Sequence, residues 1–80
     1  MPLYFIHLRD GADEVLDPDG IDMMDEAVPG VALLAARDCI VADVRSGLID
    51  LGYRIDVEDI EGSRVYTLPF AEAVKITRAN

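Results

Sequence analysis

Residues 1–11 read Met1-Pro2-Leu3-Tyr4-Phe5-Ile6-His7-Leu8-Arg9-Asp10-Gly11. An extended segment over residues 3–9 places Tyr4, Ile6 and Leu8 on one face and Leu3, Phe5 and His7 on the other. Because both faces carry apolar side chains, this strand is expected inside a sheet. The Asp-Gly pair that follows is a turn signal. The stretch therefore predicts a central strand that ends in a turn.

The remaining elements follow from local signals in the same way. Residues 14–16 predict a short edge strand, and Asp17-Pro18-Asp19-Gly20 predicts a turn. A helix should begin between Asp25, a candidate N-cap, and Pro29, and end near Ser46 before Gly47. Residues 53–58 and 64–68 predict a hairpin that Pro69 ends, followed by one helical turn within 70–76. The chain is thus expected to be α+β: a single domain over 1–80, with an antiparallel four-stranded sheet and one long helix on one face in ββαββ order.

Length and composition bear on partners and on location. An 80-residue chain buries only about 60% of its unfolded surface, and its single cysteine excludes an internal disulfide. A second chain, in a homodimer, is the expected source of extra stability. The net charge of −9 disfavours nucleic acid and anionic membranes. The favoured interpretation is that it keeps a small, partly apolar domain soluble, and the alternative is an acidic patch that meets a basic protein partner or a cation. Without a bilayer-length apolar run or a signal peptide, we expect a cytoplasmic protein.

The chain also resembles a family of small bacterial proteins of unknown function. The resemblance is carried by the opening motif Tyr4-Phe5-Ile6-His7-Leu8-Arg9-Asp10-Gly11 and then, in order, by Asp19-Gly20-Ile21, Ala35-Ala36-Arg37-Asp38, Asp59-Ile60-Glu61-Gly62-Ser63-Arg64-Val65 and Leu68-Pro69-Phe70. It extends along nearly the whole chain, with a departure at Pro29-Gly30, where relatives carry helix formers. It implies a compact ββαββ domain and no catalytic residues.

An acidic stretch is the first candidate site. Residues 10–26 hold eight acids and no base. If Gly20 is aligned with the loop glycine of an EF-hand, Asp17, Asp19 and Glu26 fall at ligand positions. Val15 then occupies the first position, where it cannot bind a metal, and no helix precedes the loop. A solvated acidic turn is the favoured interpretation, and a divalent-cation or small-ligand site is the alternative.

Other polar residues offer little chemistry in the sequence. His7 is the only histidine, and Arg9 projects from the same face of its strand. No nucleophile, metal-ligand spacing or phosphate loop accompanies them, so neither an enzymatic activity nor a cofactor is expected. Cys39, in the middle of the helix, is expected to be a small core residue.

The helix carries more apolar residues than one sheet needs. At 100° per residue, one face holds Val31, Leu34, Ala35, Cys39 and Ala42, which we expect to cover the sheet. A second stripe holds Leu33, Ile40 and Val44. We expect this stripe, or the bare sheet face around Phe5, to form an interface. The sequence thus predicts a non-catalytic interaction or regulatory protein that self-associates.

Overall fold

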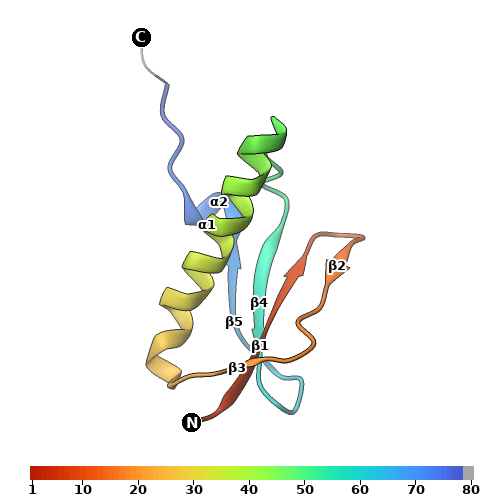
Figure 1. Cartoon of the computed structure of the whole chain (residues 1–80), viewed down its shortest axis with the longest axis vertical. Coiled ribbons are helices and arrows are strands. Elements are labelled where there is room, and N and C mark those ends of the chain that lie inside the picture. Colours follow the sequence, from red (N-terminus) through yellow and green to blue (C-terminus); the bar gives the residue numbers. More distant parts are fainter. Residues whose placement is uncertain (79–80) are drawn as a thin grey trace.

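The computed structural model describes residues 1–78 (Figure 1). A short 3-10 helix, η1 (Asp25–Ala27), leads into the long helix α1. The full order of elements is β1 (Leu3–Arg9), β2 (Glu14–Val15), β3 (Ile21–Asp22), η1, α1 (Val28–Ser46), β4 (Arg54–Glu58), β5 (Arg64–Pro69) and α2 (Phe70–Ala73). The α+β class, with one long helix on an antiparallel sheet, is confirmed.

Strand β1 lies inside the sheet, as its two apolar faces predict. The strand order is β2-β1-β4-β5, and β3 pairs with the other end of β1. Leu8 pairs with Val15 of β2, and Tyr4 pairs with Ile21 of β3, so two short strands share one edge of β1. The sheet therefore has five strands rather than the expected four, because the chain after Gly20 returns alongside β1.

The start and end of α1 follow from local chemistry. Pro29 lies in the first turn, where its missing N–H removes no helical hydrogen bond. Gly47 ends the helix at φ 85°, and its N–H donates to the carbonyl of Val44. Asp25, the expected N-cap, makes no capping bond; its carboxylate accepts the phenol O–H of Tyr4 instead. The N-cap prediction was wrong because a tertiary hydrogen bond uses this side chain.

The buried face of α1 differs from the one expected. Leu34 is 63% exposed and Ala42 is exposed, so the predicted core face is wrong at these two positions, whereas Val31, Ala35 and Cys39 are partly buried against the core. The buried residues recur every four positions: Val28, Ala32, Ala36 and Ile40. We attribute this orientation to the small alanines, which let the helix backbone approach the sheet closely. Phe70, at the start of α2, is 1% exposed and belongs to the same core.

The residues expected to form an interface are not exposed together. Ile40 is only 7% exposed and belongs to the core of its own chain. Leu33 is partly buried against that core, whereas Val44 is 57% exposed. Phe5 is half-buried on the opposite side of the sheet. The expected stripe on α1 is therefore not a continuous exposed surface.

The helix covers only part of its side of the sheet. It packs against β4, β5 and α2, and Figure 1 shows β1 and β2 to one side of it. The side chains of Ile6 and Leu8 that point to this side are only half-buried. None of the helices within residues 1–78 combines the length and apolar character that a bilayer crossing requires. The sheet thus has uncovered apolar surface of its own, in addition to exposed residues of α1 such as Leu34 and Val44.

Candidate functional site

The face of the sheet opposite α1 carries a network of charges centred on Asp56. Strand alternation sends the side chains of Arg9, Asp56 and Glu58 to this face. Arg9 Nη1 lies 3.1 Å from Asp56 Oδ2 and 2.7 Å from Glu58 Oε2. Arg54 Nε lies 3.1 Å from Asp56 Oδ2, and the Thr67 hydroxyl donates to Asp56 Oδ1 over 2.6 Å. Three neighbouring strands are therefore joined by one carboxylate.

Asp56 is enclosed by its partners. It is 1% exposed, although the alternation of β4 places it with Arg54 and Glu58 on the face opposite the apolar Ile55 and Val57. Burial alone would raise the pKa of the Asp56 carboxyl, but hydrogen bonds from Thr67, Arg9 and Arg54 outweigh it and hold the pKa below its usual range. The Arg9 hydrogen bond likewise lowers the pKa of Glu58. Both carboxylates are therefore charged at neutral pH.

His7 lies at the edge of this network and is also buried. Its Nδ1 accepts the backbone N–H of Asp17 over 3.1 Å, so the Nε2 side faces Glu58 Oε1 at 3.3 Å. The imidazole also stacks on Phe5, with ring centroids 6.3 Å apart. Within residues 1–78, every buried side-chain nitrogen and oxygen has a hydrogen-bond partner. The contacts of His7 and Arg9 thus fix the sheet, and His7 also holds the loop that contains Asp17.

The acidic candidates occupy separate roles. Asp17 accepts backbone N–H groups from Ile6, Asp19 and Gly20, and these bonds lower the pKa of its carboxyl against the opposing effect of burial. Asp19 and Glu26 are exposed. No three His, Cys, Asp or Glu side chains of the described chain are grouped so that they could hold a metal ion. Asp17 therefore orders the loop that crosses the edge of β1.

An apolar groove lies on the other side of the sheet, between α1 and the β1–β2 pair. Its volume is about 360 Å³, near the lower end of the range for small-molecule pockets. Val15 is 63% exposed and Leu16 is 51% exposed at its outer wall. The full lining is Ile6, Leu8, Val15, Leu16, Asp17, Pro18, Ala35, Cys39 and Ile55. The part of the sheet that α1 leaves uncovered is the floor of this groove.

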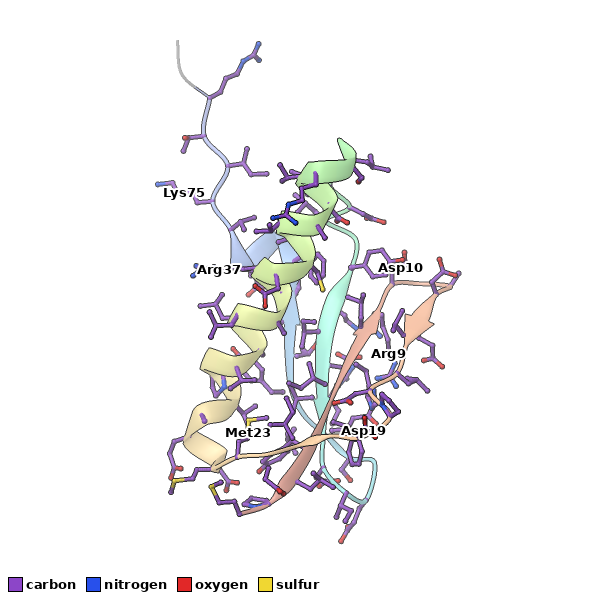
Figure 2. All side chains as sticks on the ribbon, viewed as in Figure 1. Arg9, Asp10, Asp19, Met23, Arg37 and Lys75 are labelled. Carbon is purple, nitrogen blue, oxygen red and sulfur yellow. The ribbon has the colours of Figure 1, made fainter. Side chains whose placement is uncertain are left out.

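Carboxylates lie near the groove, and one of them, Asp17, is part of its lining. On the helix wall, burial first, and then the charges of Asp43 and Asp38, raise the pKa of the Cys39 thiol. Near the turn after β1, burial and then the charges of Asp10 and Asp13 raise the pKa of Tyr53. Figure 2 shows Asp10 and Asp19 on this β1–β2 side of the molecule, and Arg37 and Lys75 on the opposite side of α1. The groove is therefore apolar inside and acidic at its rim.

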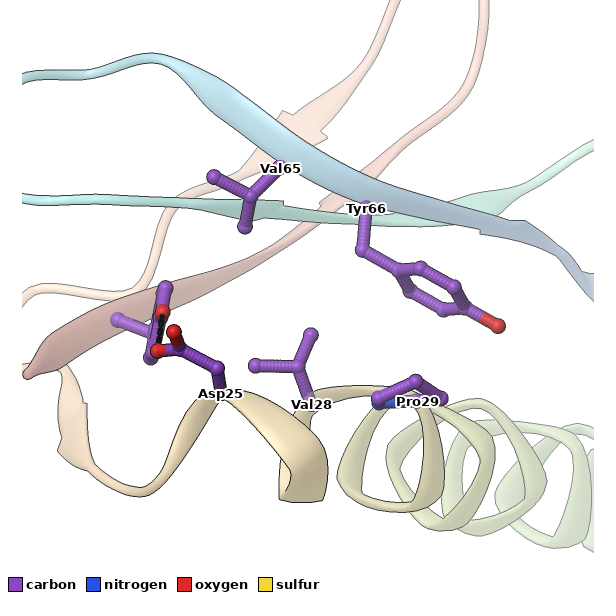
Figure 3. A pocket seen from close by; sticks show the side chains of 6 residues that line it. Asp25, Val28, Pro29, Val65 and Tyr66 are labelled. Carbon is purple, nitrogen blue, oxygen red and sulfur yellow. Dashed lines mark hydrogen bonds between the residues drawn. The ribbon is translucent and has the colours of Figure 1, made fainter.

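A second hollow lies where α1 begins beside β5 (Figure 3). It measures about 290 Å³ and is lined by Tyr4, Asp25, Val28, Pro29, Val65 and Tyr66. The hydrogen bond between Tyr4 and Asp25 closes one end, and Val65 is 48% exposed at the free edge of the sheet. Fewer aliphatic residues line this hollow than line the groove beside β1.

Residues 3–71 match the family model described as Domain of unknown function (DUF6894). The chain belongs to this family. The DUF6894 match runs from β1 into α2, so it includes the charge network and the whole groove but not residues 74–78. No curated protein matches the chain, and no solved structure matches it either.

Sequence reasoning missed most of the DUF6894 groove. It identified Cys39 and Ala35 as helix core residues and Val15 as an edge-strand residue, but it did not bring them together. The signal that was available is the run Glu14-Val15-Leu16, in which two apolar residues stand next to each other in an edge strand with no helix assigned to cover them. Asp56 was also missed, because alternation places it on the face opposite Ile55 and Val57 and no local signal indicates that its partners enclose it.

Proposed function

We propose that this chain is a protein-interaction module whose groove between α1 and β1–β2 binds an extended segment that is both apolar and basic. The observation that carries the proposal is the incomplete cover of the sheet. Ile6 and Leu8 remain half-buried, and Val15 and Leu16 stand more than half exposed beside them. A contiguous apolar surface of this kind is typical of binding sites rather than of ordinary protein surface.

Apolar burial supplies the affinity in this proposal. Transfer of one Val- or Leu-sized side chain from water into an apolar site is worth about 1.5–3 kcal/mol. The side chains of Ala35 and Cys39 on the helix wall are small, so the groove has room for branched aliphatic side chains of a partner. Two such side chains would offset part of the association entropy and give binding of modest strength.

The acidic rim supplies the selectivity. Asp17 lines the groove, and, besides burial, the charges of Asp43 and Asp38 raise the pKa of the Cys39 thiol on its helix wall. Asp10 and Asp13 add negative charge near Tyr53. These carboxylates would attract a lysine or arginine next to the apolar side chains of a partner, whereas they would repel an acidic segment. The proposal therefore retains the expectation of a basic protein partner and of self-association, and it assigns both to the groove.

Titration with two matched peptides tests the proposal. One peptide alternates valine with lysine and the other alternates valine with glutamate; both carry a fluorophore for anisotropy. We expect saturable binding of the lysine peptide alone, and a loss of about tenfold or more for Leu16→Asp, which is about 1.4 kcal/mol. Ile60→Asp changes a 73% exposed residue in the β4–β5 turn and should leave binding unchanged. Equal binding of both peptides, or equal loss in both variants, would refute the proposal.

A further inference from the structure

The segment that follows α2 has the chemistry that the groove requires. Val74 takes an extended conformation, with φ −137° and ψ 156°. The sequence then continues Lys75-Ile76-Thr77-Arg78. In an extended chain, Ile76 points to one side and Lys75 and Thr77 point to the other. Ile76 is 67% exposed, so this segment presents a branched aliphatic anchor between two cationic residues.

The segment lies on the wrong side of α1 to reach its own groove. The guanidinium of Arg37 donates to the carbonyl of Ala73 over 2.9 Å, which ties the end of α2 to one flank of the helix. Ala35 and Cys39 line the groove from the opposite flank. Figure 1 shows the segment leaving the body of the molecule, and Figure 2 shows Lys75 directed away from the sheet. A contact in the same chain would have to cross over the helix.

Two of the basic residues that form no salt bridge lie in this segment. The chain has seven basic residues, and Arg9, Arg54 and Arg64 face the carboxylates of Asp56 and Glu58 on the other side of the sheet. No salt bridge within residues 1–78 involves Lys75 or Arg78, nor Arg37 and Arg45 of α1, although the chain carries a net charge of −9. Of these four, Lys75 and Arg78 are the two that flank the exposed Ile76. A second copy presents an acidic rim to these two cations. Charge complementarity thus favours contact between copies.

We infer that the groove of one copy receives residues 74–78 of a second copy, with Ile76 in the apolar floor and Lys75 and Arg78 against the acidic rim. A two-fold axis lets each copy give one segment and accept one, so the assembly closes as a dimer. Each contact hides the exposed Val15 and Leu16 and places two positive charges beside the rim. The inference rests on the proposed function of the groove and names its occupant.

Mixing two complementary variants tests the inference. Ile76→Asp damages the segment and keeps the groove, whereas Leu16→Asp damages the groove and keeps the segment. Both positions are exposed, so both variants should retain the circular dichroism and thermal unfolding of the parent chain. In sedimentation velocity we expect a concentration-dependent dimer for the parent chain and for Ile60→Asp. Each of the two variants should be monomeric alone, and their mixture should form a heterodimer through the one intact contact.

Charge reversal gives an independent arm of the test. Lys75→Glu should weaken the dimer about tenfold, and Asp13→Lys introduced together with it should recover much of the loss. A mixture of Ile76→Asp and Leu16→Asp that stays monomeric would overturn the inference, as would a parent chain that is monomeric at ~1 mM. If that monomer still binds the lysine–valine peptide in the groove, the proposed function stands and only its assigned occupant is wrong. If the peptide also fails to bind, both the proposed function and the assigned occupant are refuted.

Discussion

The guanidinium of Arg9 lies 3.1 Å from the carboxylate of Asp56 on the neighbouring strand, and that carboxylate is 1% exposed. A buried charge of this kind is retained only when its hydrogen bonds are satisfied, and Asp56 has Arg9, Arg54 and Thr67 as partners. The network joins β1, β4 and β5 on one side of the sheet. On the other side of the sheet lies the groove, where the apolar residues of β1 are only partly covered.

Asp56→Ala should destabilise the fold because it leaves arginines without their carboxylate. Loss of one partner from a fully buried pair costs about 3–5 kcal/mol. Arg9 and Arg54 keep 21% and 38% of their side chains exposed, so water and Glu58 replace part of the interaction. We expect a loss of about 2–3 kcal/mol in the free energy of unfolding, measured with urea. Glu14→Ala, at a 54% exposed partner of Arg9, should cost at most about 1 kcal/mol.

Stability should fall in acid for the same reason. The pKa values of Asp56, Glu58 and Asp17 are lower in the fold than their usual 3.8, 4.5 and 3.8. A carboxyl with a lowered pKa stabilises the fold above its unfolded-state pKa, and this contribution disappears as the pH falls through the folded-state value. We expect the free energy of unfolding to decline from near pH 4.5 downward. Asp56→Asn should show a shallower decline; an identical slope would remove Asp56 from the explanation.

Gly20→Ala should cost more than Gly62→Ala. Both glycines have positive φ, at 75° and 81°, so alanine is strained at either site by about 1–2 kcal/mol. A Cβ on Gly20 would also lie 2.9 Å from the carbonyl oxygen of Tyr4, whereas a Cβ on Gly62 meets nothing within 4 Å. Thermal unfolding should separate the two variants, with the lower midpoint for Gly20→Ala. Equal midpoints would mean that the loop moves away from β1 at no cost.

Cys39 should react slowly with thiol reagents. Burial and the charges of Asp43 and Asp38 raise the pKa of its thiol, so little thiolate is present near neutral pH. Asp38→Asn should speed the reaction with a disulfide reagent by removing one of these charges. Because Cys39 lines the groove, the lysine–valine peptide should slow it further. A rate that the peptide leaves unchanged would place the peptide elsewhere.

Strand β1, the β4–β5 hairpin and the limits of α1 could be predicted from sequence because they depend on local chemistry, whereas β3 was not predicted. The two apolar faces of Leu3–Arg9 indicate a central strand, Gly47 ends the helix, and Pro69 ends the hairpin. The rotation of α1 could not be predicted this way. Apolar residues occur all around the helix, and the choice of Ala32 and Ala36 for the buried face depends on contacts with β4, β5 and Phe70.

The candidate site depends even more on tertiary structure. Asp56 appears solvent-facing in the alternation of β4, and only the meeting of Arg9, Arg54 and Thr67 from three strands buries it. The groove exists because α1 lies toward β5 and leaves β1 uncovered. The excess of apolar residues was visible in the sequence, but it was assigned to the helix or to the sheet face around Phe5, and the groove lies on the other face of the sheet.

Chemical-shift mapping on methyl-labelled protein tests the central claim most directly. The lysine–valine peptide is added while the methyl signals of Ile6, Leu8 and Leu16 in the groove are followed, with Ile60 and Val65 as probes outside it. The account predicts that the three groove signals shift with one saturating curve and that the two outer probes stay in place. Shifts centred on Val65, or spread evenly over the five probes, would contradict it.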